Sequence, residues 1–173
     1  MEKIAVFGSA FNPPSLGHKS VIESLVHFDR ILLVPSIAHA WGKAMLDYDI
    51  RCQLVEAFIN DLAIEQVELS LVEQSLYTPS ESVTTYAVLK KLQECHPTAD
   101  ITFVIGPDNF FKFSSFYKSD EITERWSVMA CPEKVKVRST DIRNAIINGD
   151  DFTNLSTKSV TNILQDGGLY KTM

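Results

Sequence analysis

Short apolar runs alternate along this chain with stretches in which apolar residues recur at helical spacing. The runs predict strands over residues 3–8, 31–34, 67–72, 101–105, 126–131 and, as the shortest, 135–137. Helices are expected over 18–28, from Asp47 onward, from Ser80 or Ser82 through Leu92, over 140–148 and over 158–165. Strands that are apolar along their length and alternate with helices are typical of a parallel sheet covered on both faces. The sequence therefore predicts an α/β fold with a doubly wound, mostly parallel sheet in a single domain, residues 1–173.

Three segments rich in polar or small residues each follow a predicted strand, namely 8–18, 106–109 and 138–143. Sheets of this kind bind ligands outside the carboxyl ends of their strands. The three segments are therefore expected to form one shared site.

Composition narrows the class of ligand. A net charge of −6 argues against a nucleic-acid partner, because such proteins present a basic face. A small anionic substrate remains compatible with this charge, since a few cations in one cleft can oppose the net charge of the whole chain.

Cys52, Cys95 and Cys131 lack metal-type spacing and are expected to be reduced, buried thiols, with no protein-bound metal. We expect no signal peptide, no membrane partner and a cytoplasmic location.

Residues 8–18 read GSAFNPPSLGH and join the first predicted strand to the first predicted helix. Gly8 and Ser9 allow a tight turn close to a ligand, and the two prolines reduce the entropy lost when the loop is ordered. Gly17 permits close approach at the helix entry, where His18 can donate to a phosphoryl oxygen. The alternative is a plain loop with a helix-capping or surface histidine.

Two further segments fit a phosphate or nucleotide ligand. Residues 137–143 read VRSTDIR, a predicted strand end followed by hydroxyls and free N–H groups at a helix start, with Arg143 positioned to face the same anion. Residues 105–109 read IGPDN, in which Asp108 is either a nucleotide ligand or an ordinary turn residue. No P-loop and no GxGxxG fingerprint is present, which disfavours a kinase and an oxidoreductase.

Together these segments resemble the signatures of the nucleotidylyltransferase superfamily, and particularly of the bacterial nicotinate-nucleotide adenylyltransferases. Residues 8–18 resemble the GGTFDPPHxGH signature, with Ser15 in place of the first histidine, and residues 137–143 resemble ISSTxIR, with Arg138 in place of the first serine. Residues 82–86, SVTTY, resemble a segment that holds the mononucleotide, with Val83 in place of its tyrosine.

The resemblance implies a Rossmann-like nucleotidylyltransferase fold and transfer of an adenylyl group from ATP, with Mg²⁺ carried by the ATP, to a pyridine mononucleotide. The implied catalytic residues are His18, Ser15, Lys43 and Arg143. The implied nucleotide-binding residues are Gly8, Ser9, Ala10, Phe11, Gly17, His18, Gly106, Asp108, Ser139, Thr140 and Arg143. The implied mononucleotide-binding residues are Ser82, Thr84, Thr85 and Phe116.

Two alternatives remain open from the sequence. The acceptor could be another phosphorylated molecule, such as phosphopantetheine or a polyol phosphate. The chain could instead be a catalytically weakened, regulatory nucleotide-binding module, given Ser15 and Val83. The sequence does not decide between the acid and the amide mononucleotide, nor does it decide the oligomeric state.

Overall fold

A computed structural model describes residues 1–38 and 44–172 of the chain. Within them, five parallel strands form one sheet in the order β3-β2-β1-β4-β5. The strands are β1 (Lys3–Ser9), β2 (Arg30–Pro35), β3 (Val67–Leu69), β4 (Asp100–Ile105) and β5 (Ser127–Ala130). The strand order reverses next to β1, so β1 and β4 flank the switch point at which such sheets bind ligands.

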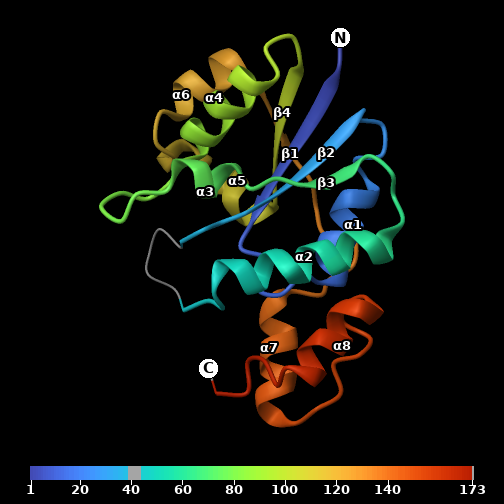
Figure 1. The fold of residues 1–173 in the computed structure, drawn as a ribbon. Coiled ribbons are helices and arrows are strands. Elements are labelled where there is room, and N and C mark those ends of the chain that lie inside the picture. Colours follow the sequence, from blue (N-terminus) through green and yellow to red (C-terminus); the bar gives the residue numbers. More distant parts are fainter. Residues whose placement is uncertain (39–43, 173) are drawn as a thin grey trace.

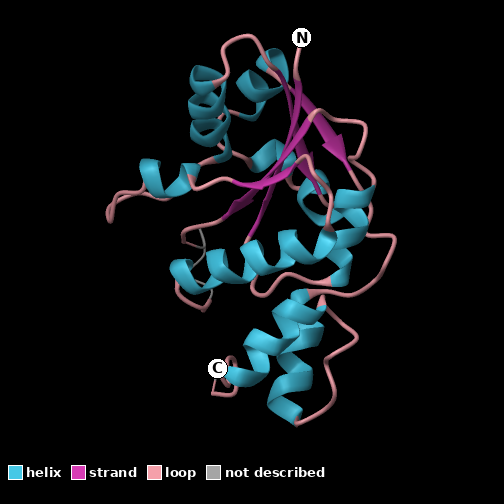
Figure 2. Ribbon diagram, turned by 45° about the vertical axis from the view of Figure 1, so that its right-hand side comes forward, coloured by secondary structure: helices cyan, strands magenta, loops and turns pink. Residues whose placement is uncertain are grey.

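Helices cover both faces of this sheet (Figure 2). They are α1 (Leu16–Glu23), α2 (Tyr48–Leu62), α3 (Val72–Leu76), α4 (Thr85–Cys95), α5 (Pro107–Phe111), α6 (Ser119–Arg125), α7 (Ser139–Asn148) and α8 (Lys158–Asp166), with a 3₁₀ turn at Phe113–Ser115. Figure 1 shows α7 and α8 beyond the end of the sheet that lies opposite the N-terminus. Because β1 runs away from the N-terminus, α7 and α8 lie at the carboxyl ends of the strands.

The apolar strands supply two cores, one on each face. In β1, Ala5 and Phe7 pack with α1, α2, α7 and α8, whereas Ile4 and Val6 pack with α3, α4 and α6. Successive side chains of a strand point to opposite faces, so a strand buried on both sides must be apolar throughout. The doubly wound, parallel α/β architecture predicted from the sequence is confirmed.

Several predicted boundaries were wrong. Residues 135–137 form no strand, because the Val137 N–H donates back to the Val135 carbonyl at 2.9 Å in a tight local turn. Residues 24–28 are turns after α1, and β3 ends at Leu69 because Val72 begins α3. The helix after Ser82 begins at Thr85, where the Thr84 hydroxyl caps it by accepting from the Ala87 N–H at 3.1 Å.

Two other expectations concern burial. Cys52 and Cys131 are buried, but Cys95 is exposed, contrary to the expectation of three buried thiols. No helix in residues 1–38 and 44–172 combines the length and the apolar character that crossing a membrane requires.

Candidate active site

Two adjoining pockets open at the carboxyl ends of the strands. The large pocket has a volume of about 570 Å³ and the small pocket one of about 310 Å³. Both are lined by Ser9, Ala10, His18, Asp108, Asn109 and Glu133, so they form one continuous cleft. The cleft lies where the three segments singled out in the sequence converge.

The structure brings nearly all of the predicted site residues to this cleft. The large pocket is lined by Gly8, Ser9, Ala10, His18, Gly106, Asp108, Ser82, Thr84, Thr85 and Phe116. The small pocket is lined by Ser9, Ala10, Phe11, Ser15, His18, Asp108, Ser139, Thr140 and Arg143. Lys43 lies outside the described residues. His18 and Arg143, far apart in the sequence, therefore border the same small pocket.

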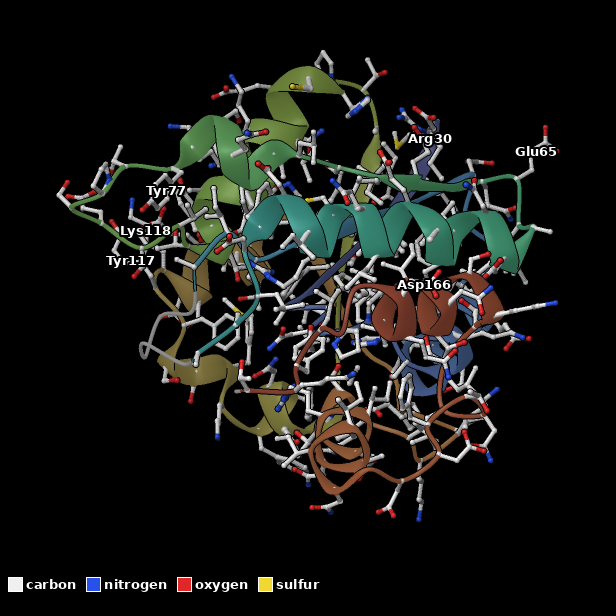
Figure 3. All side chains as sticks on the ribbon, turned by 60° about the horizontal axis from the view of Figure 1, so that its bottom comes forward. Arg30, Glu65, Tyr77, Tyr117, Lys118 and Asp166 are labelled. Carbon is white, nitrogen blue, oxygen red and sulfur yellow. The ribbon has the colours of Figure 1, made fainter. Side chains whose placement is uncertain are left out.

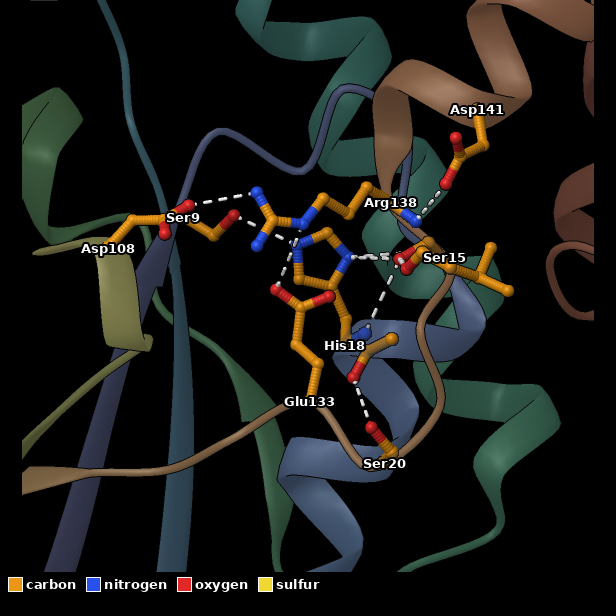
Figure 4. Close-up of polar contacts among 10 residues, drawn as sticks. Ser9, Ser15, His18, Ser20, Asp108, Glu133, Arg138 and Asp141 are labelled. Atoms are coloured by element: carbon orange, nitrogen blue, oxygen red, sulfur yellow. Dashed lines mark hydrogen bonds and ion pairs between the residues drawn. The ribbon is translucent and has the colours of Figure 1, made fainter.

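His18 is held on both sides of its ring by serines (Figure 4). The Ser15 backbone N–H donates to Nδ1 at 3.0 Å, and the Ser9 hydroxyl lies 3.0 Å from Nε2. Because Nδ1 accepts a hydrogen bond, the ring proton resides on Nε2 and points toward Ser9. Burial lowers the pKa of His18 to about 4, so the imidazole is neutral near pH 7. The side chain is therefore a neutral hydrogen-bond donor at the edge of the cleft.

Aromatic packing supports the same ring. The Phe11 ring lies 4.7 Å from the His18 ring, centroid to centroid, and packs edge-on against Phe7. Phe11 is fully buried and has a φ of 48°, in the left-handed region that residues other than glycine seldom adopt. The turn after β1 thus accepts backbone strain while placing the Phe11 side chain behind His18.

Ser15 caps helix α1, and its hydroxyl makes hydrogen bonds within the protein. Its hydroxyl donates to the Val137 carbonyl at 3.1 Å and accepts from the His18 N–H at 3.4 Å, and the residue is 1 % exposed. The resemblance implies a catalytic role for Ser15. The hydroxyl also lies 3.1 Å from Nδ1 of His18, so its contacts support the imidazole, and a catalytic role for Ser15 stays a prediction.

Gly17 contacts the chain's own backbone rather than the cleft. A Cβ at this position would lie 2.1 Å from the Val137 carbonyl oxygen and 2.6 Å from Oε2 of Glu133. The 133–137 segment therefore crosses directly over the start of α1, and only glycine leaves room for it. Gly17 is not among the described residues that line either pocket, and its implied role in nucleotide binding stays a prediction.

The start of α7 is tied to the loop of the first signature. The Ser139 hydroxyl donates to the Pro13 carbonyl at 2.6 Å, and Arg143 donates to the Asn12 carbonyl at 2.7 Å and to the Thr140 hydroxyl at 3.1 Å. The two signatures are thus joined by direct hydrogen bonds, which leaves the α7 N-terminus facing the small pocket.

Asn12 offers a donor that has no partner within the described part of the chain. Its Oδ1 accepts from the Tyr170 hydroxyl at 2.6 Å and from the Leu46 N–H at 3.3 Å, which identifies the other amide atom as nitrogen. That nitrogen is buried without a hydrogen bond, and Asn12 borders the small pocket. A buried, unpaired donor beside a pocket suits an oxygen-rich ligand.

Arg51, near the start of α2, is buried. Its guanidinium donates to the carbonyls of Leu46, Ala10 and Ser36 at 2.7–2.8 Å and to Ile37 at 3.4 Å. It thereby ties the turn after β1 to the segment after β2 from behind the cleft. The apolar neighbours Ile50 and Cys52 in the sequence of α2 are the signal that could have indicated the burial of Arg51.

Three charged residues of the cleft were not predicted as site residues. Arg138 makes a 2.8 Å ion pair with Asp108 and lies 3.9 Å from Glu133. Glu73 lines the large pocket, where burial raises the pKa of its carboxyl to about 7. Arg138 could have been found from its position just before Ser139 and Thr140, whereas no sequence pattern marks Glu73 or Glu133.

In residues 1–38 and 44–172, no three His, Cys, Asp or Glu side chains cluster closely enough to hold a metal ion.

Comparisons with known proteins agree with this geometry. The sequence profile of the cytidylyltransferase-like family matches residues 6–146. A Clostridium tetani protein assigned as a nicotinate-nucleotide adenylyltransferase is 24% identical over 205 residues, covering 99% of this chain and 100% of its own length. A crystal structure from Vibrio parahaemolyticus, assigned to the same activity, is 63% identical with a TM-score of 0.90, covering 100% of this chain and 98% of its own.

A more distant structure shares the fold alone. The nicotinic acid mononucleotide adenylyltransferase of Plasmodium falciparum, solved in complex with NaAD, is 15% identical with a TM-score of 0.81 over 100% of this chain and 99% of its own. The profile match spans both signature segments, whose residues meet in the cleft described above. This chain accordingly belongs to the cytidylyltransferase-like family of nucleotidyltransferases.

Proposed function

We propose that this protein is an adenylyltransferase of NAD biosynthesis that joins ATP to nicotinate mononucleotide, giving the dinucleotide and pyrophosphate. The observation that carries the proposal is the meeting of His18, Arg143 and the α7 N-terminus in one small pocket that opens into a larger one. The small pocket suits a polyphosphate and the large one suits two nucleotide moieties. The names of the relatives support nicotinate mononucleotide as the acceptor.

The small pocket provides the groups that hold the polyphosphate. The Nε2–H of His18 exchanges the Ser9 hydroxyl, 3.0 Å away without nucleotide, for an oxygen of the α-phosphate, where charge increases in the transition state. The α7 N-terminus at Ser139 and Thr140 and the guanidinium of Arg143 stabilise the leaving pyrophosphate. Lys43, outside the described residues, is proposed as a further phosphate cation, as the family resemblance implies.

The nucleotides occupy the rest of the cleft. Gly8, Ser9, Ala10, Phe11, Gly106 and Asp108 border the adenosine, with the Asp108 carboxylate accepting from ribose hydroxyls. Ser82, Thr84, Thr85 and Phe116 border the mononucleotide, with the Phe116 ring against the pyridine. Gly17 contributes indirectly, by allowing the 133–137 segment to close over α1.

The reaction needs no covalent intermediate on the protein. An oxygen of the mononucleotide 5′-phosphate forms a bond to the α-phosphorus of ATP, while the bond from that phosphorus to the bridging oxygen breaks and pyrophosphate leaves with the electron pair. The protein aligns the two nucleotides and stabilises charge. Mg²⁺ enters as part of the Mg–ATP substrate and keeps most of its waters.

Product analysis tests the proposal. Purified protein is incubated with Mg–ATP and either nicotinate or nicotinamide mononucleotide, and dinucleotide and pyrophosphate are quantified. Parallel reactions contain phosphopantetheine or a polyol phosphate as acceptor. We expect dinucleotide with nicotinate mononucleotide, whereas turnover only with nicotinamide mononucleotide or with another acceptor, or ATP binding without any turnover, would overturn the proposal.

Location and further partners stay predictions. We propose a cytoplasmic protein without a nucleic-acid or membrane partner, supported by the net charge of −6. Fractionation and nucleic-acid binding assays test these points.

A further inference from the structure

Arg138 spans the rim of the small pocket between two carboxylates (Figure 4). Its guanidinium lies 2.8 Å from Oδ2 of Asp108, at the start of α5, and 3.9 Å from Oε1 of Glu133. The Arg138 and Asp108 side chains are 57 % and 68 % exposed. An ion pair between such exposed groups is weakly held, because water competes for both partners.

The Arg138–Asp108 pair affects how much positive charge the small pocket offers to a ligand. Among the described lining residues, Arg138 and Arg143 are offset by Asp108 and Glu133, and His18 is neutral. A triphosphate therefore meets little net positive charge while Arg138 stays paired with the two carboxylates. Arg143 borders the pocket from a position set by its bond to the Asn12 carbonyl, whereas the Arg138 guanidinium contacts two carboxylates and can turn from them toward a ligand.

The attachment of Arg138 favours that movement. Its backbone N–H donates to Asp141 at 2.8 Å, which anchors the residue at the start of α7, while its side chain is bonded only to carboxylates. The α7 N-terminus and Asn12, whose amide nitrogen is unpaired among the described residues, line the same small pocket as Arg138, so a phosphate chain bound there would lie within its reach. Charge-assisted bonds to phosphate oxygens are stronger than an exposed ion pair.

We propose that Arg138 is an additional polyphosphate-binding residue that Asp108 holds in the nucleotide-free protein, and that nucleotide binding transfers its guanidinium from Asp108 to the phosphates. The transfer releases the Asp108 carboxylate to accept hydrogen bonds from the ribose. The exchange rests on the proposed function, because it assumes that the small pocket takes the triphosphate of ATP. It makes binding of the phosphates and binding of the ribose mutually dependent.

The test measures binding of tripolyphosphate and of ATP by calorimetry at constant ionic strength without Mg²⁺. The variants are Arg138→Ser, Asp108→Asn and the double variant, each checked by thermal unfolding. Arg30→Ser is the matched control, since Arg30 forms a 2.6 Å pair with Glu68 and borders neither pocket. Figure 3 shows Arg30 on the opposite side of the molecule from Tyr117, which lines the large pocket.

Arg138→Ser is expected to weaken tripolyphosphate binding about tenfold, the size of one lost charge-assisted contact. Asp108→Asn is expected to strengthen tripolyphosphate binding about threefold or more, because Arg138 is released. The same substitution strengthens ATP binding less, or weakens it, because the ribose loses its acceptor. In the Arg138→Ser background, the gain from Asp108→Asn should largely disappear.

Three results overturn the exchange. The first is unchanged tripolyphosphate binding in Arg138→Ser, or no binding of either probe to the wild-type protein. The second is a gain from Asp108→Asn that persists in full in the double variant, which would reflect only the removed charge. The third is an equal effect of Asp108→Asn on both probes. A wild-type protein that makes dinucleotide but gives any of these results leaves the proposed function intact and refutes the exchange alone.

Discussion

The backbone N–H of Ser15 points at Nδ1 of His18 from 3.0 Å, and this contact decides which form of the imidazole the protein contains. A ring nitrogen that accepts a hydrogen bond carries no proton, so Nε2 must carry it. Protonating the ring would bring two N–H groups face to face at Nδ1. The same contact therefore directs the donor toward Ser9 and the cleft and opposes a charged His18.

The first prediction concerns pH. In the nucleotide-free protein the His18 imidazole should titrate with a pKa of about 4 instead of 6.5, which NMR of the ring protons measures directly. As pH falls from 7 to 5, the unfolded chain binds a proton at this residue while the folded protein does not. The free energy of unfolding should therefore decrease by about 2 kcal/mol from this group. In His18→Gln this part of the pH dependence should be missing, and an imidazole midpoint near 6.5 would contradict the assignment.

A second prediction concerns catalysis. Replacing His18 by alanine removes the Nε2–H donor and should lower kcat at least about 10²-fold, the effect of losing one preorganised donor to a developing charge. Steady-state pyrophosphate release measures it. His27→Ala is the matched control, because His27 is exposed and borders neither pocket. An unchanged kcat in His18→Ala would reject the role of His18.

Gly17→Ala provides a third prediction. The new methyl group would overlap the Val137 carbonyl, so the 133–137 segment must move and the Ser15–Val137 hydrogen bond must lengthen. Overpacking of this kind should reduce the free energy of unfolding by about 1–3 kcal/mol, measured by urea denaturation. Gly106→Ala is the control for stability, because no atom lies within 4 Å of a Cβ there. Equal stability of the two variants would show that the segment adapts freely.

The fourth prediction concerns Arg51. Arg51→Met keeps much of the side-chain volume but leaves four carbonyl oxygens without their donor. We expect a loss of about 3 kcal/mol of unfolding free energy, hence a Tm lower by roughly 6–12 °C in a chain of this size. Arg125→Met, an exposed position on α6, should shift the Tm far less. Similar Tm changes in both variants would mean that the buried guanidinium does not stabilise the loops.

Local pattern was sufficient for the fold and for the location of the site. Apolar runs such as Ile4 to Phe7 indicate strands that are buried on both faces, because an apolar side chain favours burial on whichever face it points to. Their order with the helices then placed residues 8–18, 106–109 and 138–143 at one edge of the sheet. The meeting of His18 and Arg143 in one pocket follows from that topology.

Contacts between distant segments could not be predicted in the same way. The 135–137 run is apolar enough for a strand, yet the structure uses it to cross Gly17 and to accept the Ser15 proton. The pairing of Arg138 with Asp108 likewise depends on where α5 and α7 begin in space. The sequence by itself determined the five strands of the sheet, the five helices it marked by apolar spacing and the edge that holds the site, since periodicity and side-chain type act over a few residues. Only the tertiary structure decided which polar groups face one another across the cleft, because hydrogen bonds and ion pairs depend on distances of a few ångströms between remote parts of the chain.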